Sequence, residues 1–322
     1  MEYNDAVAAF LTSRRAADRS SKTVDWYETM LARFGDWIER EGVPTDVSEI
    51  TPEHVDQFLA AERAAGLKRR TVQGRYRALS AMFNWLEGRE RHRAAVSGRA
   101  PALAASPVAA VERPPAPRHE PRRADLADLA ALLESIQPST WVDLRDRLII
   151  RMLFWSGMRV GELSNLEVRD VDLREEVIHV REREEGAQES RLKSRDRIVP
   201  LHSSLRPQVL EYLFQRPPTG ESALFIGSTG DGGPRGRLLG NGMRQMLQRR
   251  AKRAGITYWN PHSYRHTMAM KLLNDGEVEL GIVSKILGHS SPEITRRIYA
   301  DFVDTSIKRA YSQAADRLSG AL

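Results

Sequence analysis

Arg159 and Arg265, in this chain of 322 residues, each stand beside a predicted helix start and three positions from another polar side chain. Arg159 precedes Glu162, and His262 precedes Arg265, by that step. Residues three apart share one face of a helix, so Glu162 can orient Arg159, and His262 and Arg265 can face one anion. The guanidinium fork suits phosphate or carboxylate, which it binds through two parallel hydrogen bonds. A surface ion pair is the plain alternative for Arg159 and Glu162.

Three more polar residues add to this set. Lys193 lies in a polar connection, where charged side chains are usually solvated, and His289 lies in Leu-Gly-His-Ser-Ser-Pro-Glu. Tyr299 follows on a predicted helix, where a lone tyrosine is usually a core residue. A catalytic role is favoured over these alternatives, because two arginines, two histidines and a tyrosine follow in order and each stands beside a predicted helix boundary.

His262 and His266 also form a His-xxx-His pair, the spacing of two zinc ligands. The zinc-protease signature requires Glu directly after the first histidine, and this chain has Ser263 there. We therefore predict no metal and no other cofactor, and we expect His266 to be a packed or helix-capping residue. The glycine-rich stretch 227–242 lacks the Gly-Lys-Ser/Thr end of a nucleotide-binding loop. It is predicted to be a flexible loop whose Arg235 and Arg237 can contact a polyanion.

The composition narrows the class of protein. Lys and Arg number 49 against 43 Asp and Glu, and the net charge of +6 favours a polyanionic partner such as nucleic acid. Cysteine is absent, which excludes disulfides, thiol nucleophiles and cysteine-ligated metal clusters. There is no apolar run near the roughly 18–20 residues of a membrane helix, and no signal-peptide pattern at the start. A soluble cytoplasmic protein is expected.

The elements that must hold these residues divide into two units. Residues 1–93 are predicted to be all-helical, because apolar residues recur every three or four positions over 24–38 and again over 72–86. The second of these helices is expected to end before Gly88. Thr51 followed by proline predicts a helix start at which the hydroxyl caps the first turn.

The start of the helix near residue 70 is strongly basic. Residues 68–77 contain five basic side chains and no acid. Backbone amides at a helix start, together with guanidinium groups, bind phosphate well, although a solvated polar face is the alternative. The predicted contacts with a nucleic-acid backbone are Lys68, Arg69, Arg70, Thr71 and Arg75.

Residues 94–121 carry six of the 16 prolines and show no helical or strand periodicity. We predict an extended, semi-stiff linker there. Residues 122–322 are predicted to form a mainly helical domain with a small antiparallel sheet. Its predicted elements are a helix over 141–156 stopped by a glycine, a helix opening at Arg159, a hairpin of strands 177–181 and 198–200, and helices over 241–254, 263–274, 280–287, 292–299 and 304–318.

Three strings carry a resemblance to a known family. They are Gly-Met-Arg-Val-Gly-Glu-Leu (157–163), Pro-His-Ser-Tyr-Arg-His-Thr (261–267) and Leu-Gly-His-Ser-Ser-Pro-Glu-Ile-Thr (287–295). Together with Lys193 and Tyr299 in order, they resemble the active site of the tyrosine recombinase (phage integrase) family. The resemblance spans 122–322 and, more weakly, the first unit, which resembles the family's helical core-binding domain.

Two departures from the family pattern are visible. Tyr264 stands where the family usually has leucine. The connection that holds the lysine is about one residue shorter than in many members, which leaves Lys193 as the best lysine candidate, with Arg191 and Arg195 as neighbouring cations.

The resemblance implies a metal-free cleavage of DNA. Arg159 and Arg265 would hold the non-bridging oxygens of a phosphodiester, with a hydrogen bond from His289. Tyr299 would attack and form a 3′-phosphotyrosyl linkage, His262 would handle the tyrosine proton, and Lys193 would protonate the leaving 5′-hydroxyl. Because the covalent bond conserves the phosphoester energy, no ATP is needed for rejoining.

The resemblance also implies partners and leaves alternatives. Site-specific recombination or integration would join two double-stranded DNA sites in a homotetramer, with no membrane involved. The predicted helix 304–318 would pack either on its own domain or on a neighbouring subunit. The alternatives are a type IB topoisomerase-like relaxing or resolving enzyme, or a DNA-binding regulator without catalysis.

Overall fold

The computed structural model describes residues 1–115, 122–181, 196–274, 278–289, 291–293, 295 and 296. The chain forms two compact units, Met1–His119 and Glu120–Leu322. Lys193 and Tyr299, with Arg191, Arg195 and the predicted helix 304–318, lie outside the described residues. None of the described helices is both long and apolar enough to cross a membrane.

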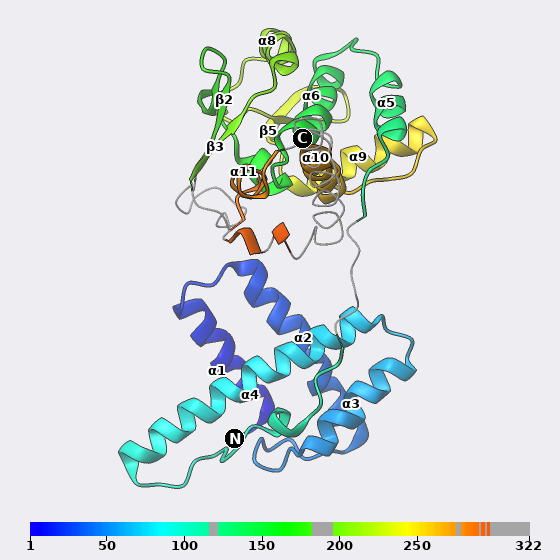
Figure 1. Ribbon diagram of the computed structural model, residues 1–322. Coiled ribbons are helices and arrows are strands. Elements are labelled where there is room, and N and C mark those ends of the chain that lie inside the picture. The colour runs from blue at the N-terminus through cyan, green and yellow to red at the C-terminus, as the bar shows by residue number, and fades with distance from the viewer. Residues whose placement is uncertain (116–121, 182–195, 275–277, 290, 294, 297–322) are drawn as a thin grey trace, which may run out of the picture. The chain divides into compact units, whose positions relative to one another are not determined.

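The first unit is a bundle of four helices (Figure 1). Its helices are α1 (Tyr3–Ala16), α2 (Ser21–Glu41), α3 (Pro52–Ala64) and α4 (Arg69–Ser97), followed by the 3-10 turn η1 (Pro107–Ala110). Thr51 caps α3 as predicted, because its hydroxyl accepts from the backbone N–H of His54. Tyr3, Phe34 and Phe58 lie at the centre of the buried core, with ring centroids 5.1–5.3 Å apart in edge contacts.

The helix predicted to end before Gly88 continues to Ser97, so that expectation is wrong. A helical glycine costs only about 1 kcal/mol relative to alanine. The turns beyond Gly88 place Glu90 in a buried position, where its carboxylate accepts from the backbone N–H of Ala102 at 3.1 Å. The helix ends instead at Gly98, whose φ of 66° is a left-handed cap.

The predicted linker is also wrong over 94–111. Leu103, Val108 and Val111 are buried in the core of the first unit. Glu87 of α4 accepts from the backbone N–H of Ser106 at 3.2 Å, which fixes this segment against the helix. The prolines removed helical periodicity without preventing burial of the aliphatic side chains between them.

The second unit is mainly helical with two small antiparallel sheets. Three strands, β1 (Val171–Asp172), β2 (Val177–Val180) and β3 (Arg197–Pro200), pair in the order β1-β2-β3, with Ile178 opposite Val199. The predicted hairpin is thus present. The other elements are α5 (Leu126–Glu134), α6 (Trp141–Ser156), α7 (Val160–Asn165), η2 (Val168–Asp170), η3 (Ser203–Leu205), α8 (Arg206–Gln215), β4 (Ile226–Ser228), β5 (Pro234–Arg237), α9 (Gly240–Ala254), α10 (Pro261–Asn274) and α11 (Leu280–Leu287).

The glycine-rich stretch predicted as a flexible loop is ordered. Its residues form the β4–β5 hairpin and the first turn of α9. The hairpin turn is closed by a hydrogen bond from the backbone N–H of Thr229 to the carbonyl of Gly233 at 2.9 Å. The strands are short and hold glycine and proline, so they lack the alternation by which a strand is recognised.

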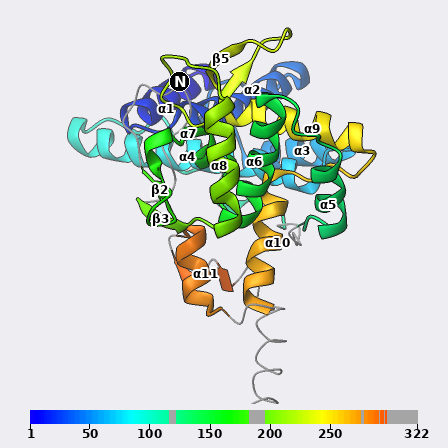
Figure 2. The same cartoon turned by 90° about the horizontal axis from the view of Figure 1, so that it is seen from above.

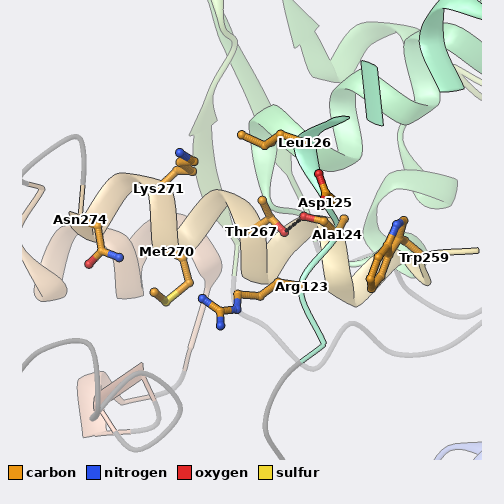
Figure 3. A pocket seen from close by; sticks show the side chains of 9 residues that line it. All are labelled: Arg123, Ala124, Asp125, Leu126, Trp259, Thr267, Met270, Lys271 and Asn274. Atoms are coloured by element: carbon orange, nitrogen blue, oxygen red, sulfur yellow. Dashed lines mark hydrogen bonds between the residues drawn. The ribbon is translucent and has the colours of Figure 1, made fainter. Parts of the chain in front are cut away.

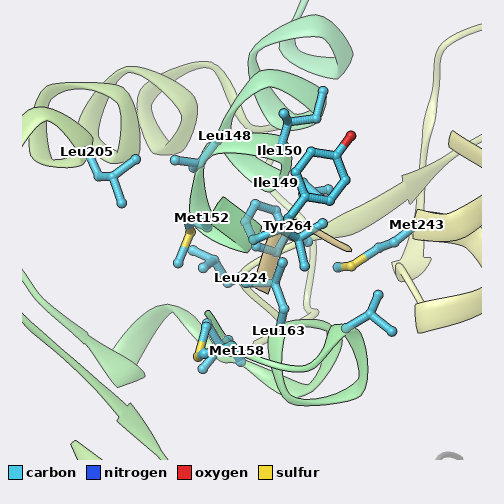
Figure 4. Packing of buried hydrophobic residues seen from close by; sticks show 14 of the residues in the cluster. Leu148, Ile149, Ile150, Met152, Met158, Leu163, Leu205, Leu224, Met243 and Tyr264 are labelled. Carbon is cyan, nitrogen blue, oxygen red and sulfur yellow. The ribbon is translucent and has the colours of Figure 1, made fainter. Parts of the chain in front are cut away.

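The core of the second unit surrounds α6, which is packed against α8 and α10 (Figure 2). Gly157 ends α6 with φ of 58°, as the sequence predicted. Tyr264, the residue that replaces the family's leucine, is 2% exposed and contributes its ring to the same cluster as Leu148 and Met243 (Figure 4). Burial raises the pKa of Tyr264, so this tyrosine serves packing rather than nucleophilic attack.

The segment that opens the second unit is bound to α10. The hydroxyl of Thr267 donates to the carbonyl of Ala124 at 2.9 Å, and a hollow beside this contact is lined by Arg123, Trp259 and Lys271 (Figure 3). None of the four predicted catalytic residues that the structure describes lines it. The contact therefore serves to hold α10, the helix that carries His262 and Arg265, in place.

Candidate active site

Arg159 occupies the junction between α6 and α7. It is the residue before the first turn of α7, and Glu162 in that turn accepts from both its backbone N–H (2.8 Å, to Oε2) and its Nη1 (2.9 Å, to Oε1). The Arg159 side chain is 29% exposed, whereas that of Glu162 is 1% exposed. The predicted pair is present, and it is half-buried rather than a free surface pair.

Arg265 lies at the second turn of α10 and is almost fully buried. Its Nη1 donates to the carbonyl of Gly157 at 2.6 Å, and its Nη2 donates to the carbonyl of Leu287 at 2.7 Å. These carbonyls are at the ends of α6 and α11, which are 108 and 22 residues from Arg265 in sequence. Arg265 therefore joins three helices at the place where Arg159 begins α7.

His262 stands in the first turn of α10. Asn260 begins the turn, because its side-chain oxygen accepts from the backbone N–H of His262 at 2.9 Å. The pKa of His262 is lowered by desolvation and then by the positive charges of Arg265 and Arg159. His262 is therefore neutral at pH 7 and able to accept a proton.

His289 follows Gly288, which ends α11 in the left-handed conformation with φ of 63°. A 2.6 Å hydrogen bond joins its Nδ1 to the hydroxyl of Thr295. Desolvation, followed by the charges of Arg265 and Arg159, lowers the pKa of His289 to about 4. The neutral ring can donate one hydrogen bond, and the contact with Thr295 restricts its orientation.

The structure thus brings together four of the six predicted catalytic residues. Arg159 and Arg265 each lower the pKa of both histidines, which places the two guanidinium groups and the two imidazoles in one electrostatic neighbourhood. The other two, Lys193 and Tyr299, lie outside the described residues. Two guanidinium groups beside two neutral imidazoles can bind an anion. They can also stabilise the additional negative charge that the anion acquires during a reaction.

One residue of this site was not singled out in the sequence. Arg197, the first residue of β3, binds both carboxylate oxygens of Glu162, at 3.1 Å from Nη1 and 2.7 Å from Nη2. It is 35 residues from Glu162, so no helical spacing could have paired them. The only sequence signal was a basic residue directly before the apolar strand Ile-Val-Pro-Leu.

The predicted nucleic-acid contacts divide into exposed and buried residues. Lys68, Arg69 and Arg70 are exposed at the start of α4, and Thr71 is half-buried. Arg75 is buried, donates to Glu62 at 3.0 Å and also binds the carbonyl of Thr29. The prediction is wrong for Arg75, because a guanidinium that satisfies a carboxylate inside the bundle cannot reach a phosphate.

Arg235 and Arg237, the two predicted nucleic-acid contacts of the glycine-rich stretch, also divide into an exposed and a mostly buried residue. Arg235 is exposed on β5. Arg237 is mostly buried and donates to the carbonyl of Ser164 at 3.1 Å, with Glu221 3.6 Å away. The prediction is therefore wrong for Arg237, which holds β5 against the end of α7. Among the described residues, no three carboxylate or imidazole groups gather as a metal site would require.

Comparison with known proteins identifies the family of the chain. The family model described as "Phage integrase family" matches residues 123–305, and the model described as "Phage integrase, N-terminal SAM-like domain" matches residues 8–90. The tyrosine recombinase XerD of Corynebacterium glutamicum is 31% identical over 92% of this chain and 93% of its own length. The tyrosine recombinase XerC of Xanthomonas axonopodis is 28% identical over 92% of each chain.

Solved structures show the same fold. The XerH site-specific recombinase in a post-cleavage complex with palindromic difH substrate has a TM-score of 0.69 at 21% identity and covers 93% of this chain and 82% of its own. The Tn1549 transposon integrase in complex with a circular intermediate DNA has a TM-score of 0.71 at 18% identity, with coverage of 96% and 99%. Because the integrase model matches more than half of the chain and a relative above 30% identity spans nearly all of it, the chain belongs to the phage integrase family of tyrosine recombinases.

Proposed function

We propose that the chain is a site-specific DNA recombinase that cuts and rejoins double-stranded DNA through a 3′-phosphotyrosyl intermediate. One observation carries the proposal: desolvation, followed by the charges of Arg265 and Arg159, lowers the pKa of both His262 and His289, so two guanidinium groups act on two neutral imidazoles in one site. Relatives that carry the name tyrosine recombinase, and neighbours solved with their DNA substrates, support it.

The chemistry follows from the charges at that point. Attack on a phosphodiester builds negative charge on its non-bridging oxygens, and Arg159 with Arg265 supplies guanidinium donors that are already oriented by protein contacts. His289 adds a neutral donor. Because Arg265 is held by two carbonyls, it need not reorganise when the phosphate arrives.

Two residues complete the proposed reaction. Tyr299 is the proposed nucleophile; its phenol has a pKa of about 10 in water and must lose a proton as it attacks. His262, neutral at pH 7, is the proposed acceptor, and Lys193 is the proposed donor to the leaving 5′-hydroxyl. The bond from Tyr299 to the 3′-phosphate forms as the bond to the 5′-oxygen breaks, so a second 5′-hydroxyl can reverse the step without ATP.

The finer assembly is part of the proposal. Strand exchange between two DNA sites requires four cleavages, which a homotetramer on DNA would supply in two sequential pairs through a four-way junction. The exposed cations Lys68, Arg69 and Arg70 of the first unit are proposed contacts with the DNA backbone, together with Arg235. A cytoplasmic location is also part of the proposal, and the naming of its relatives as DNA recombinases supports it.

The test begins with selection of a DNA duplex that the protein binds. A duplex selected by the protein from a random library is nicked next to the scissile position, incubated with the protein in EDTA, and run on a denaturing gel. A covalent protein–DNA band is expected for the wild type, and its loss is expected for Tyr299→Phe with DNA affinity retained. The matched control is Tyr264→Phe, which should keep the band because Tyr264 is a core residue.

Other outcomes would replace the proposal. A chain that binds its selected DNA without any covalent band would be a regulator rather than an enzyme. A chain that relaxes supercoiled DNA lacking the selected site, and never joins two sites, would be a topoisomerase-like enzyme.

A further inference from the structure

Arg197 links three parts of the site that are distant in sequence. Its Nη1 and Nη2 bind the two oxygens of Glu162 in a bidentate pair, and its Nε donates to the carbonyl of Ile286 at 3.2 Å. Its side chain is only 9% exposed. The guanidinium therefore connects β3 to the first turn of α7 and to the last turn of α11.

The carboxylate of Glu162 is shared between two arginines. Oε1 accepts from Arg159 Nη1 and Arg197 Nη1, and Oε2 accepts from the Arg159 backbone and Arg197 Nη2. A carboxylate that binds on one side to a buried guanidinium has little freedom to rotate. Arg197 thus fixes the group that in turn fixes Arg159.

The end of α11 is held in the same way. Arg197 binds the carbonyl of Ile286, and Arg265 binds the next carbonyl, that of Leu287. His289 comes two residues later. Cations at the C-terminal carbonyls of a helix are stabilising, because those carbonyls have no partner within the helix.

Gly288 packs directly against Arg197. A Cβ atom added at Gly288 would lie 2.8 Å from Cζ of Arg197, at a residue whose φ is already 63°. Glycine at this position thus serves two purposes, a left-handed helix end and room for the guanidinium. The backbone that leads into His289 is therefore shaped around Arg197.

We propose that Arg197 is a positioning residue for DNA cleavage, one that acts on the phosphate by orienting Arg159 through Glu162 and His289 through the end of α11. This inference rests on the proposed function. Arginine is required rather than any cation, because only a planar fork can bind both carboxylate oxygens through two nitrogens and a carbonyl through the third.

The experiment compares Arg197→Met with Arg250→Met. Arg250 is a matched control, because it is also a mostly buried arginine of the second unit, and its partners Asp143 and Asp146 are not residues of the site. Single-turnover formation of the covalent complex is measured at saturating DNA. DNA affinity and thermal melting are measured on the same preparations.

A roughly 10- to 100-fold slower cleavage is expected for Arg197→Met, the loss of one or two charge-assisted hydrogen bonds to the positioning carboxylate. DNA affinity should change less than about threefold. Arg250→Met should melt earlier yet cleave at the wild-type rate once bound. Equal cleavage rates for wild type and Arg197→Met would overturn the inference.

A second substrate separates positioning of the phosphate from assistance to the leaving group. When sulfur replaces the bridging 5′-oxygen, the leaving thiolate needs no proton, so a general-acid defect is relieved. The defect of Arg197→Met should persist on this substrate. Full recovery would mean that Arg197 acts through the leaving group, which contradicts the inference.

Arg197→Lys is a second variant, included in case Arg197→Met fails to fold. It keeps the buried charge but not the fork, and an intermediate loss of about tenfold is expected. A wild-type rate for this variant would overturn the claim that the fork is needed. Absence of the covalent complex in the wild type itself would instead overturn the proposed function, and the inference with it.

Discussion

Two arginine clusters in this molecule are built in opposite ways. At the start of α4, Lys68, Arg69 and Arg70 are exposed. In the second unit, Arg265 is buried and the side chain of Arg197 is only 9% exposed, and each is bound by protein oxygen atoms on at least two segments. The first kind of cluster gives affinity through charge alone, whereas the second gives a fixed direction to each donor.

The contrast is one of preorganisation. An exposed cation is screened by salt over about 10 Å and loses side-chain entropy when it contacts a phosphate. A buried arginine has already lost that entropy, so the site can stabilise charge as it develops in the transition state. We therefore expect the first cluster to set binding and the second to set the rate of cleavage.

Arg265→Lys should produce the largest effect and is the strongest test of this division. A lysine cannot bind the carbonyls of Gly157 and Leu287 and a phosphate together, so cleavage at saturating DNA should fall by at least about 10³-fold. The measurement is single-turnover formation of the covalent complex. Arg250→Lys is the matched control, and a loss of the same size there would mean that the effect comes from folding.

Glu162→Gln should be the next largest effect. The amide keeps the shape of the side chain but loses the charge shared by Arg159 and Arg197, and it can accept at only one of its two former oxygen positions. A fall of about 10²-fold in cleavage is expected, with DNA affinity nearly unchanged. Glu221→Gln, which affects the pair with Arg237, is the control and should cleave normally.

Part of this site could be predicted from the sequence. Arg159 with Glu162, and His262 with Arg265, were found because residues three apart share a helix face. The helix end at Gly157 was marked by a glycine that adopts positive φ. Local spacing and local backbone chemistry were enough for these features.

The site features that the sequence did not predict depend on contacts between residues far apart in the chain. Arg197 binds Glu162 across 35 residues, and Arg265 binds Gly157 across 108. Arg75 and Arg237 look like surface cations in sequence, yet Glu62 and the carbonyl of Ser164 hold them inside. A charge pattern states which residues are cationic, but only tertiary packing decides which of them have protein partners.

Replacing Lys68, Arg69 and Arg70 together by glutamine tests the exposed cluster. If the three contact phosphates, the slope of log affinity against log salt should become shallower by about 2.7, and affinity near 0.1 M salt should fall roughly 10- to 100-fold. Cleavage at saturating DNA should not change. The slope is measured by fluorescence anisotropy on the selected duplex.

The control for the exposed cluster lies on the same helix. Arg91 and Arg93 are exposed but form ion pairs with Glu87 and Glu90. Replacing both by glutamine should alter the salt slope much less. If the two sets of variants gave the same slope, the start of α4 would not be a specific contact with DNA.

The smallest expected effect is the change that His289→Gln makes in the pH dependence of stability. The lowered pKa of His289, about 4, has as its causes desolvation and the charges of Arg265, Arg159, His266 and Arg197. The unfolded chain, with an ordinary histidine pKa near 6.5, therefore binds the proton more readily than the folded chain. Stability from this group is present above about pH 6.5 and is lost as the pH falls toward 4.

The free energy of unfolding, measured by urea titration at about pH 7 and pH 5, should therefore decrease on acidification. His289→Gln should reduce that decrease by about 1 kcal/mol, a figure discounted for the partial solvent exposure of the ring. His92→Gln, in the first unit, is the matched control and should leave the decrease as it is in the wild type. A wild-type pH dependence in His289→Gln would show that desolvation and the neighbouring arginines do not hold this imidazole neutral. The electrostatic argument for preorganisation would then rest on His262 alone.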